Sequence, residues 1–139
     1  MTPDFTDLDN YDAVIITRGR LHELPAECPE PDIDFDLRRF LSDPAHRPEG
    51  DMLDLTGLDE KVRQFVLDTP GARDLIGTAV PLIFMMAKVK HTVVMVGCAG
   101  GKHRAAAVGQ ELAGQLGAFG LRVKVVHLHV DLPRVIRAA

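Results

Sequence analysis

Runs of apolar and β-branched residues predict four strands. Two of these runs, DAVIIT at residues 12–17 and TVVMV at residues 92–96, are almost continuously apolar, as expected for strands buried on both faces. Residues 33–37 (IDFDL) alternate apolar and acidic positions, which indicates a half-buried strand. Residues 122–130 (RVKVVHLHV) alternate in the same way and form the fourth predicted strand.

Helical spacing of apolar residues predicts three helices, at residues 60–67, 72–90 and about 103–118. Asp59 is a plausible cap for the first helix. Gly77 and Pro81 are expected to kink or interrupt the second, because proline removes a backbone donor. Gly120 is expected to end the third in a left-handed conformation.

The order strand, strand, two helices, strand, helix, strand predicts an α/β fold. We expect a Rossmann-like single domain over residues 12–132, with a mixed, mostly parallel sheet flanked by helices. An acidic lead-in (1–11) and a short tail (133–139) flank it. The last strand–helix–strand unit implies a parallel pair of strands. In such sheets ligands bind beyond the carboxyl ends of the strands.

Composition narrows the class of protein. The 139 residues are 46% apolar and 26% charged with a net charge of −4, typical of a globular domain and weak evidence against binding nucleic acid over a whole surface. The two cysteines, Cys28 and Cys98, have no disulfide-framework spacing, which fits a reducing compartment. The acidic N-terminus lacks a signal-peptide core, and residues 75–87 are too short to span a membrane. We therefore expect a cytoplasmic protein without a membrane association.

The most informative segment is GCAGGKHR, residues 97–104, between the strand at 92–96 and the third helix. A strand, a glycine-rich turn and a helix place free backbone N–H groups and the positive end of a helix dipole at one point, where anions bind. Lys102, His103 and Arg104 add positive charge at a helix N-terminus, where cations are unfavourable without an anion. We interpret the segment as a phosphate-binding loop. A tight turn without a ligand is the plainer interpretation.

An alternative function rests on the same loop. Cys98 and Arg104 have the C-x5-R spacing of cysteine-dependent phosphatases, in which a thiolate at a helix N-terminus attacks phosphorus. Those enzymes usually carry His before the cysteine and Ser or Thr after the arginine, whereas this chain has Gly97 and Ala105. A general acid would also be needed, and the candidates are Asp36, Asp43 and Asp131. The loop lacks the Walker A pattern, so ATP binding is not indicated.

Other polar residues follow the predicted strands. Arg38, with Asp36 beside it as an orienting partner, and His46, in the long irregular segment 42–57, are candidates for contacting a ligand. His127 and His129 would share a strand face, but no third ligand has a fixed spacing to them, and we expect no metal and no cofactor. Five arginines are candidates for contacting RNA: Arg18, Arg20, Arg38, Arg39 and Arg47.

Four ordered motifs resemble the C-terminal domain of RapZ-type proteins, bacterial RNase-adaptor or nucleotide-binding proteins. GCAGGKHR followed by QELA is similar to the family's GCTGGKHRS…EQLA. Phe35 to Arg38 followed by residues 43–46 (DPAH) resembles FDVRFLPNPH, LTGLD at 55–59 is the family's LTGLD, and HVDL at 129–132 resembles HRDL. The resemblance covers roughly residues 12–132.

The resemblance implies an α/β domain that binds free phosphate or an amino-sugar phosphate and, in some members, small regulatory RNA and RNase partners. By matching position it implies a ligand site of Arg38, His46, Thr56, Gly57, Cys98, Ala99, Gly100, Gly101, Lys102, His103 and Arg104, supported by Asp36, His129 and Asp131. Ala99 and Ala105 stand where the family has Thr and Ser, which removes two hydroxyl donors, and extra spacing at 39–46 shifts His46.

Full-length family members carry an N-terminal P-loop kinase-like domain for which this sequence has no counterpart, so nucleotide hydrolysis is not implied for it. We therefore expect a phosphate-sensing or adaptor domain and lean against an enzyme. A homo-oligomer or a protein partner ranks ahead of RNA, because the chain has net charge −4, no Trp and a single Tyr to stack on bases.

Overall fold

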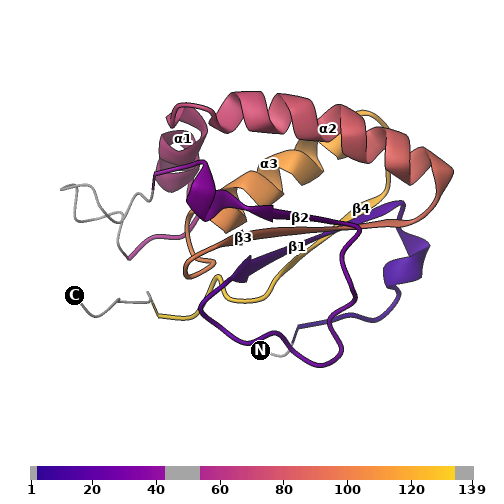
Figure 1. The fold of residues 1–139 in the computed structure, drawn as a ribbon, viewed down its shortest axis with the longest axis horizontal. Helices are drawn as coiled ribbons and strands as arrows, with labels where there is room; N and C mark the ends of the chain where they lie inside the picture. The colour runs from indigo at the N-terminus through magenta and orange to yellow at the C-terminus, as the bar shows by residue number, and fades with distance from the viewer. Residues whose placement is uncertain (1–2, 43–53, 134–139) are drawn as a thin grey trace.

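In the computed structural model, which describes residues 3–42 and 54–133, four parallel strands form one sheet in the order β2-β3-β1-β4 (Figure 1). The strands are β1 (Ala13–Gly19), β2 (Ile33–Asp36), β3 (Thr92–Cys98) and β4 (Val123–His127). The sequence predictions of an α/β fold and of these four strands are confirmed. Every pairing between the strands is parallel, so the sheet of the described residues is wholly parallel rather than mixed.

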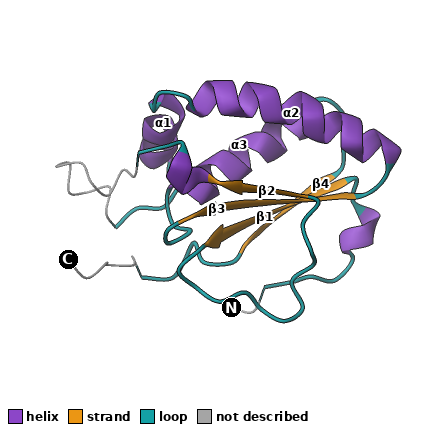
Figure 2. Ribbon diagram, viewed as in Figure 1, coloured by secondary structure: helices purple, strands orange, loops and turns teal. Residues whose placement is uncertain are grey.

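Three helices cover a single face of this sheet (Figure 2). They are α1 (Glu60–Asp68), α2 (Ala72–Val89) and α3 (Arg104–Ala118), and their apolar sides share one buried cluster with the alternate strand residues Ala13, Ile15, Val94 and Val96. Gly109 allows α3 to lie close against β1, since a Cβ there would stand 2.3 Å from Thr17 Cγ2. Burial of these apolar stripes is the main force that holds the helices on the sheet.

The opposite face of the sheet is covered by irregular chain. Its strand residues Val14, Ile16, Val93, Met95 and Val126 form a second cluster with Leu8 of the 3-10 helix η1 (Leu8–Asn10). Phe5, Tyr11, Cys28 and Leu128 pack against that cluster. The lead-in and the loop between β1 and β2 therefore take the place of the helices that a doubly covered sheet would have.

Two predicted details of the strands are wrong. First, β4 pairs with β1 and not with β3, so β1, whose residues Ala13 to Thr17 are fully buried, lies between the two strands joined by α3. Second, β4 ends at His127 instead of reaching residue 130. The last backbone hydrogen bond between this segment and β1 runs from Leu128 N–H to the Thr17 carbonyl. The next β1 donor, Gly19 N–H, donates to the His129 side chain instead.

The helices also differ from the sequence prediction in detail. α2 runs without interruption through Pro81, because Ile76, Val80, Ile83 and Ala87 anchor it on the core on both sides of the proline. Asp59 does occupy the N-cap position of α1, but its carboxylate accepts from Thr56 N–H at 2.7 Å rather than capping the helix. Gly120 ends α3 at φ 93°, as predicted. No helix in the described ranges is both long enough and apolar enough to cross a bilayer.

Candidate functional site

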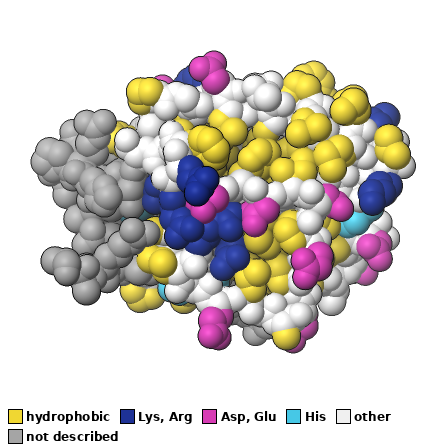
Figure 3. Space-filling view, in the orientation of Figure 1, with side chains coloured by type: hydrophobic (Ala, Val, Ile, Leu, Met, Phe, Trp, Pro, Cys, Tyr) yellow, Lys and Arg dark blue, Asp and Glu magenta, His cyan; other side chains and the backbone are white. Residues whose placement is uncertain are grey.

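The carboxyl ends of the strands bring polar residues from distant parts of the sequence into one row. In the register of the sheet, Gly97 at the end of β3 lies between Asp36 of β2 and Arg18 of β1. The next β3 residue, Cys98, lies opposite Gly19. Figure 3 shows Lys and Arg side chains gathered on this part of the surface with acidic side chains among them. The edge predicted from the strand order is therefore the edge where charge is concentrated.

The loop between β3 and α3 folds around the sulfur of Cys98. The thiol sulfur accepts hydrogen bonds from the N–H groups of Gly101, at 3.2 Å, and Ala105, at 3.4 Å. Because Cys98 ends β3 and Ala105 lies in the first turn of α3, these contacts hold the sulfur at the positive end of the helix dipole. The side chain is only 3% exposed.

Glycine is required in this loop because the loop rests directly on β1. Gly101 has φ 78°, and a Cβ on it would lie 2.5 Å from the backbone nitrogen of Gly19. A Cβ on Gly19 would lie 2.4 Å from the carbonyl carbon of Gly100. Leu21 N–H also donates to the Ala99 carbonyl at 3.1 Å. Packing alone therefore explains Gly101, which the RapZ resemblance assigned to the ligand site, and Gly19 of β1 beneath it.

The loop also carries backbone donors that do not bond to the Cys98 sulfur. Ala99, Gly100 and Lys102 are half-buried, and within the described residues the N–H groups of Gly100 and Lys102 form no hydrogen bond. These donors lie close to the start of α3, next to the Lys102 ammonium in the sequence. Backbone N–H groups beside a helix N-terminus and a cation are the elements of an anion site.

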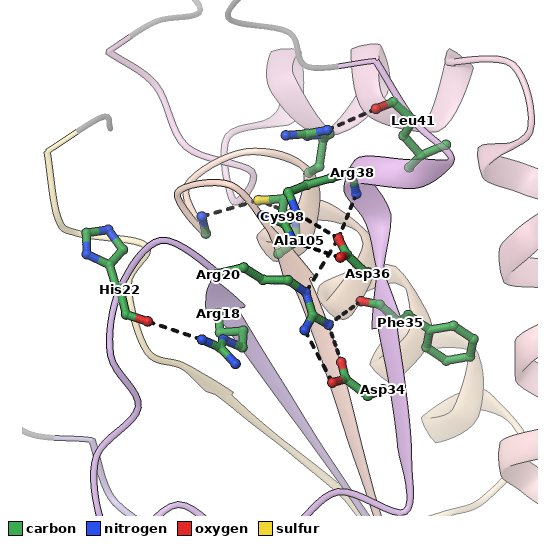
Figure 4. A network of polar contacts seen from close by, with 12 residues as sticks. Arg18, Arg20, His22, Asp34, Phe35, Asp36, Arg38, Leu41, Cys98 and Ala105 are labelled. Carbon is green, nitrogen blue, oxygen red and sulfur yellow. Dashed lines mark hydrogen bonds and ion pairs between the residues drawn. The ribbon is translucent and has the colours of Figure 1, made fainter. Parts of the chain in front are cut away.

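Arg20 forms the centre of the ion-pair network beside the loop (Figure 4). Its guanidinium pairs with the Asp34 carboxylate, donates to the Phe35 carbonyl at 3.0 Å, and lies 3.5 Å from Asp36 Oδ1. It also crosses Gly97 so closely that a Cβ there would meet Arg20 Nε at 2.4 Å. Gly97 therefore lets the arginine lie over the strand, and a Cβ there would displace the guanidinium.

Asp36 and Arg38 pair as the sequence predicted. Arg38 belongs to the 3-10 helix η2 (Leu37–Arg39), and its Nε and Nη2 donate to the two Asp36 carboxylate oxygens at 3.0 and 2.8 Å. These bonds, together with the Arg38 backbone N–H and the nearby Arg20, lower the pKa of Asp36 to about 2. Asp36 is therefore ionised at neutral pH and cannot serve as a general acid there.

Two further segments attach to the loop from outside the sheet. Gly57 N–H donates to the Lys102 carbonyl at 2.7 Å, and a Cβ on Gly57 would stand 2.3 Å from the His103 carbonyl oxygen. Arg104 Nη1 donates to the Leu41 carbonyl at 2.9 Å. His103 and Arg104 are 4% and 6% exposed, so their side chains are enclosed by these segments.

The two histidines at the end of β4 have separate roles. Hydrogen bonds join the His127 ring nitrogens to Thr17 Oγ1 at 2.7 Å and Gln110 Oε1 at 3.1 Å. His129 Nδ1 accepts from Gly19 N–H at 2.8 Å, which requires the neutral ring, and the ring lies against that of His22 with centroids 4.6 Å apart and planes tilted by 38°. Burial, with His22 and Arg18 nearby, lowers the pKa of His129 to about 4. The predicted shared strand face is wrong, because His129 lies beyond the strand.

Comparison with known proteins agrees with the resemblance seen in the sequence. The family model described as the RapZ C-terminal domain matches residues 14–131. The chain belongs to this family. It is 35% identical over 121 residues to the nucleotide-binding protein SCO1952 of Streptomyces coelicolor, covering 83% of this chain and 38% of that protein. It is 34% identical over 136 residues to the nucleotide-binding protein Lxx11490 of Leifsonia xyli, covering 91% and 44% respectively. The chain thus spans about two fifths of the length of these relatives.

Most residues that the RapZ resemblance assigns to the ligand site meet at the carboxyl edge of the sheet. Hydrogen bonds and strand pairing connect the segments that carry them. These segments are the loop itself, the Thr56–Gly57 turn, the Asp36–Arg38 pair and, through Gly19, His129. Asp131 is exposed and lies with His127 along a different hollow, beside β4. His46 lies outside the described residues, as do Asp43 and Arg47.

Three residues at this RapZ-type edge were not assigned to the site from the sequence. The sequence identifies Arg20 as a candidate for contacting RNA at the end of a strand, not as a ligand-site residue, and Asp34 only as part of an alternating pattern. Leu41 contributes a carbonyl, which no side-chain pattern can reveal. The signal available for the first two was their opposite charge at the ends of strands that flank β3.

Proposed function

We propose that this RapZ C-terminal domain binds inorganic phosphate or an amino-sugar phosphate at the 97–104 loop and acts as a ligand-sensing adaptor domain. The observation that carries the proposal is that the N–H groups of Gly100 and Lys102, in the loop just before α3, bond to no described residue and lie beside the Lys102 side chain. A phosphate group accepts several hydrogen bonds at once and is attracted by a helix N-terminus.

The charged side chains around the loop support an anionic ligand. Arg20 and Arg38 contribute two guanidinium groups, and Asp34 and Asp36 balance them in the free domain. Arg38 is exposed, and within the described part of the chain its side chain bonds only to Asp36, so it is the cation that can turn toward a ligand with least rearrangement. Arg–phosphate contacts are charge-assisted and often bidentate.

The connections of the loop support a sensing role. The loop is tied to Leu41 through Arg104 and to the Thr56–Gly57 turn through Lys102. These two segments lie immediately before and shortly after residues 43–53 in the sequence. A ligand that contacts the loop can bias these segments, to the extent that it binds one of their arrangements more tightly than the other.

Backbone amide chemical shifts test the location of the ligand. The uniformly 15N-labelled domain is titrated with inorganic phosphate, glucosamine-6-phosphate and glucose-6-phosphate. The last compound lacks the amino group and so tests whether that group contributes to binding. We expect saturable shifts concentrated at residues 97–104 and extending to Arg38 and Gly57, with α2 unaffected. Saturable shifts centred elsewhere, or no shifts with any of the three compounds, would overturn the proposed function.

A titration with structured RNA over a salt series separates a small-molecule sensor from an RNA adaptor. Binding that weakens steeply with salt would support RNA, because phosphate contacts release counterions. We expect a protein partner or a second copy of the chain in preference to RNA, because four of the basic side chains at the edge are already engaged: Arg18 with the His22 carbonyl, Arg20 with Asp34, Arg38 with Asp36, and Arg104 with the Leu41 carbonyl.

One observation favours the cysteine-phosphatase alternative. Two backbone N–H groups are directed at the Cys98 sulfur beside the start of α3, which is where the nucleophile of a cysteine phosphatase lies. Two others weigh against it: the sulfur is almost fully buried, and Asp36 is held ionised. Turnover of an aryl phosphate that depends on Cys98 distinguishes the two functions.

A further inference from the structure

One long side of β4 is open, because in the described part of the chain β4 is the last strand of the sheet and pairs only with β1. Leu128 N–H donates to the Thr17 carbonyl, and the backbone groups of successive strand residues point to alternate sides. The backbone groups of Val125 and His127 therefore point away from β1, and neither N–H donates to any residue that the structure describes. This edge thus presents donors and acceptors that an added strand can pair with.

A hollow of about 270 Å³ follows this open edge. Residues 124–128 all line it, although the side chains of a strand alternate between its two faces. A hollow that touches every one of these residues lies along the edge of the strand rather than over one face. Pro3 and Asp4 of the lead-in and Asp131 and Leu132, which follow the strand, complete the lining.

The side chains around the hollow suit a strand with alternating residues. Leu132 is 39% exposed and Val125 is half-buried, so apolar side chains of a partner would find apolar contacts there. The His127 ring instead turns toward the helical face, where it bonds to Thr17 and Gln110, so its backbone is the part that faces the open edge. In docking of this kind main-chain bonds supply affinity and side-chain contacts supply specificity.

The charges that line the hollow fit a basic partner. The lining contains two carboxylates, Asp4 and Asp131, and one ammonium, Lys124. Lys124 Nζ is already engaged, since it lies 3.6 Å from the Asp4 carboxylate and donates to the Thr6 carbonyl at 3.4 Å. Asp131 is exposed and pairs with no cation among the described residues. A Lys or Arg side chain is therefore the group that complements this hollow, with Asp131 as its ion-pair partner.

The opposite edge of the sheet is protected in ways that β4 is not. β2 has only four residues, and two of them, Asp34 and Asp36, carry charges that Arg20 binds across the end of the sheet. Short edge strands and charged side chains hinder the addition of another strand. The one formal charge in β4 is Lys124, which is held against the lead-in. β4 is therefore the edge at which a further strand can add.

We propose that the β4 edge binds an extended segment of another protein, which adds a fifth strand to the sheet and places a Lys or Arg side chain beside Asp131. The bound segment pairs with the backbone of Val125 and His127 and carries apolar side chains next to its basic one. This interface rests on the backbone of β4 and not on the 97–104 loop, so it is independent of the proposed ligand.

Selection of peptides on the full chain is the first test. A phage-displayed library of random linear peptides is selected against the wild type, and an enriched peptide is synthesised. We expect Lys or Arg among β-branched residues, saturable amide shifts at residues 123–132, and slower hydrogen exchange at the Val125 and His127 amides. The same peptide with methylated backbone nitrogens should not bind. Selection without any saturable binder, or binders that leave residues 123–132 unshifted, would overturn the proposal.

A proline substitution tests the backbone pairing. Val125→Pro removes one outward N–H and leaves the bonds to β1, because that N–H takes no part in the pairing of the two strands. We expect the peptide to bind Val125→Pro about tenfold or more weakly than the wild type. Val125→Thr is the matched control, since it keeps both the N–H and a branched side chain, and it should bind as the wild type does. Equal binding by a folded Val125→Pro would overturn the proposal.

Charge reversal does not depend on how well Val125→Pro folds. Asp131→Lys should weaken the peptide by about tenfold, and a peptide with Glu in place of its basic residue should bind this variant more tightly than the wild type. Asp68→Lys makes the same change of charge at an exposed residue of α1 and should have no effect. Equal binding to all three proteins would overturn the proposal. So would a wild-type dimer in sedimentation equilibrium that Val125→Pro dissociates, because it would assign the edge to a second copy.

Discussion

The backbone N–H of Gly101 donates to the thiol sulfur of Cys98 at 3.2 Å and closes the loop around the sulfur. Ala105 N–H, in the first turn of α3, donates to the same sulfur, so two backbone donors are directed at Cys98. The Cys98 side chain therefore accounts for the curvature of the loop without any chemistry at the sulfur. The N–H groups of Gly100 and Lys102, which bond to no described residue, are the ones available to a ligand.

Substitution of Cys98 tests whether its role is structural. We expect Cys98→Ser, which retains an acceptor, to fold, and Cys98→Ala to lose about 1–3 kcal/mol of unfolding free energy because two buried N–H groups lose their acceptor. Chemical denaturation measures both. We expect no turnover of an aryl phosphate by the wild type. Turnover that Cys98→Ser abolishes in a well-folded protein would instead establish the phosphatase function.

Substitution of glycines by alanine tests how closely the loop is packed on β1. Gly101→Ala should cost about 2–4 kcal/mol, because it combines a positive φ with a clash against the Gly19 backbone. Gly71→Ala is the control for the backbone term, since Gly71 has φ 90° in open space, and should cost about 1 kcal/mol. Gly114→Ala, inside α3 with open space around it, should stabilise by about 0.5–1 kcal/mol. Equal effects of the first two would contradict the close contact.

The strand and helix positions could be predicted from the sequence because they depend on local periodicity. The apolar run of β3 and the helical spacing of α3 define the loop between them without any knowledge of the tertiary structure. The pairing of β4 with β1 could not be predicted, since nothing local to either strand specifies its neighbour. The resemblance to RapZ-type proteins placed Thr56 and Gly57 in the site, which no pattern in this chain would have done.

The parts of the site that escaped prediction depend on contacts made only in the folded chain. Arg20 reaches Asp34 and Asp36 by crossing over Gly97, which has no side chain in its way. His129 binds Gly19 N–H only because β4 ends at His127, three residues earlier than its alternating pattern suggests. Such contacts join residues more than ten positions apart and have no signature in either local segment.

The Asp36–Arg38 pair predicts a loss of stability in acid. Because the pKa of Asp36 is lowered to about 2 from an ordinary value of 3.8, the ionised carboxylate stabilises the fold above pH 4. That contribution, about 1–2 kcal/mol after allowance for partial solvent exposure, should be lost as the pH falls from 4 to 2. Asp36→Asn should be less stable than the wild type at pH 6, and the difference should narrow at pH 2. A constant difference across this range would contradict the pairing.

His129 predicts a second, separate pH dependence. Its pKa of about 4 lies below the ordinary value of 6.5, so the fold favours the neutral ring and should lose up to about 2–3 kcal/mol as the pH falls from 6.5 to 4. His127, whose pKa burial also lowers, contributes in the same direction. His129→Asn keeps an acceptor for Gly19 N–H and should flatten the profile, whereas His129→Leu should be destabilised by about 1–3 kcal/mol at every pH. A profile as steep in His129→Asn as in the wild type would assign the dependence to other groups.

Calorimetric titration with inorganic phosphate and glucosamine-6-phosphate tests the central claim most directly, using the wild type and the variants Lys102→Ala, Arg38→Ala and Arg73→Ala. Lys102 and Arg38 lie at the loop and its rim, whereas Arg73 is an exposed arginine on α2 that pairs with Asp68. The wild type should bind at least one of the two compounds. Lys102→Ala and Arg38→Ala should each weaken that binding by about tenfold, and Arg73→Ala should leave it unchanged. No binding by the wild type at millimolar ligand, or equal affinities in all four proteins, would contradict the assignment of the 97–104 loop as a phosphate site.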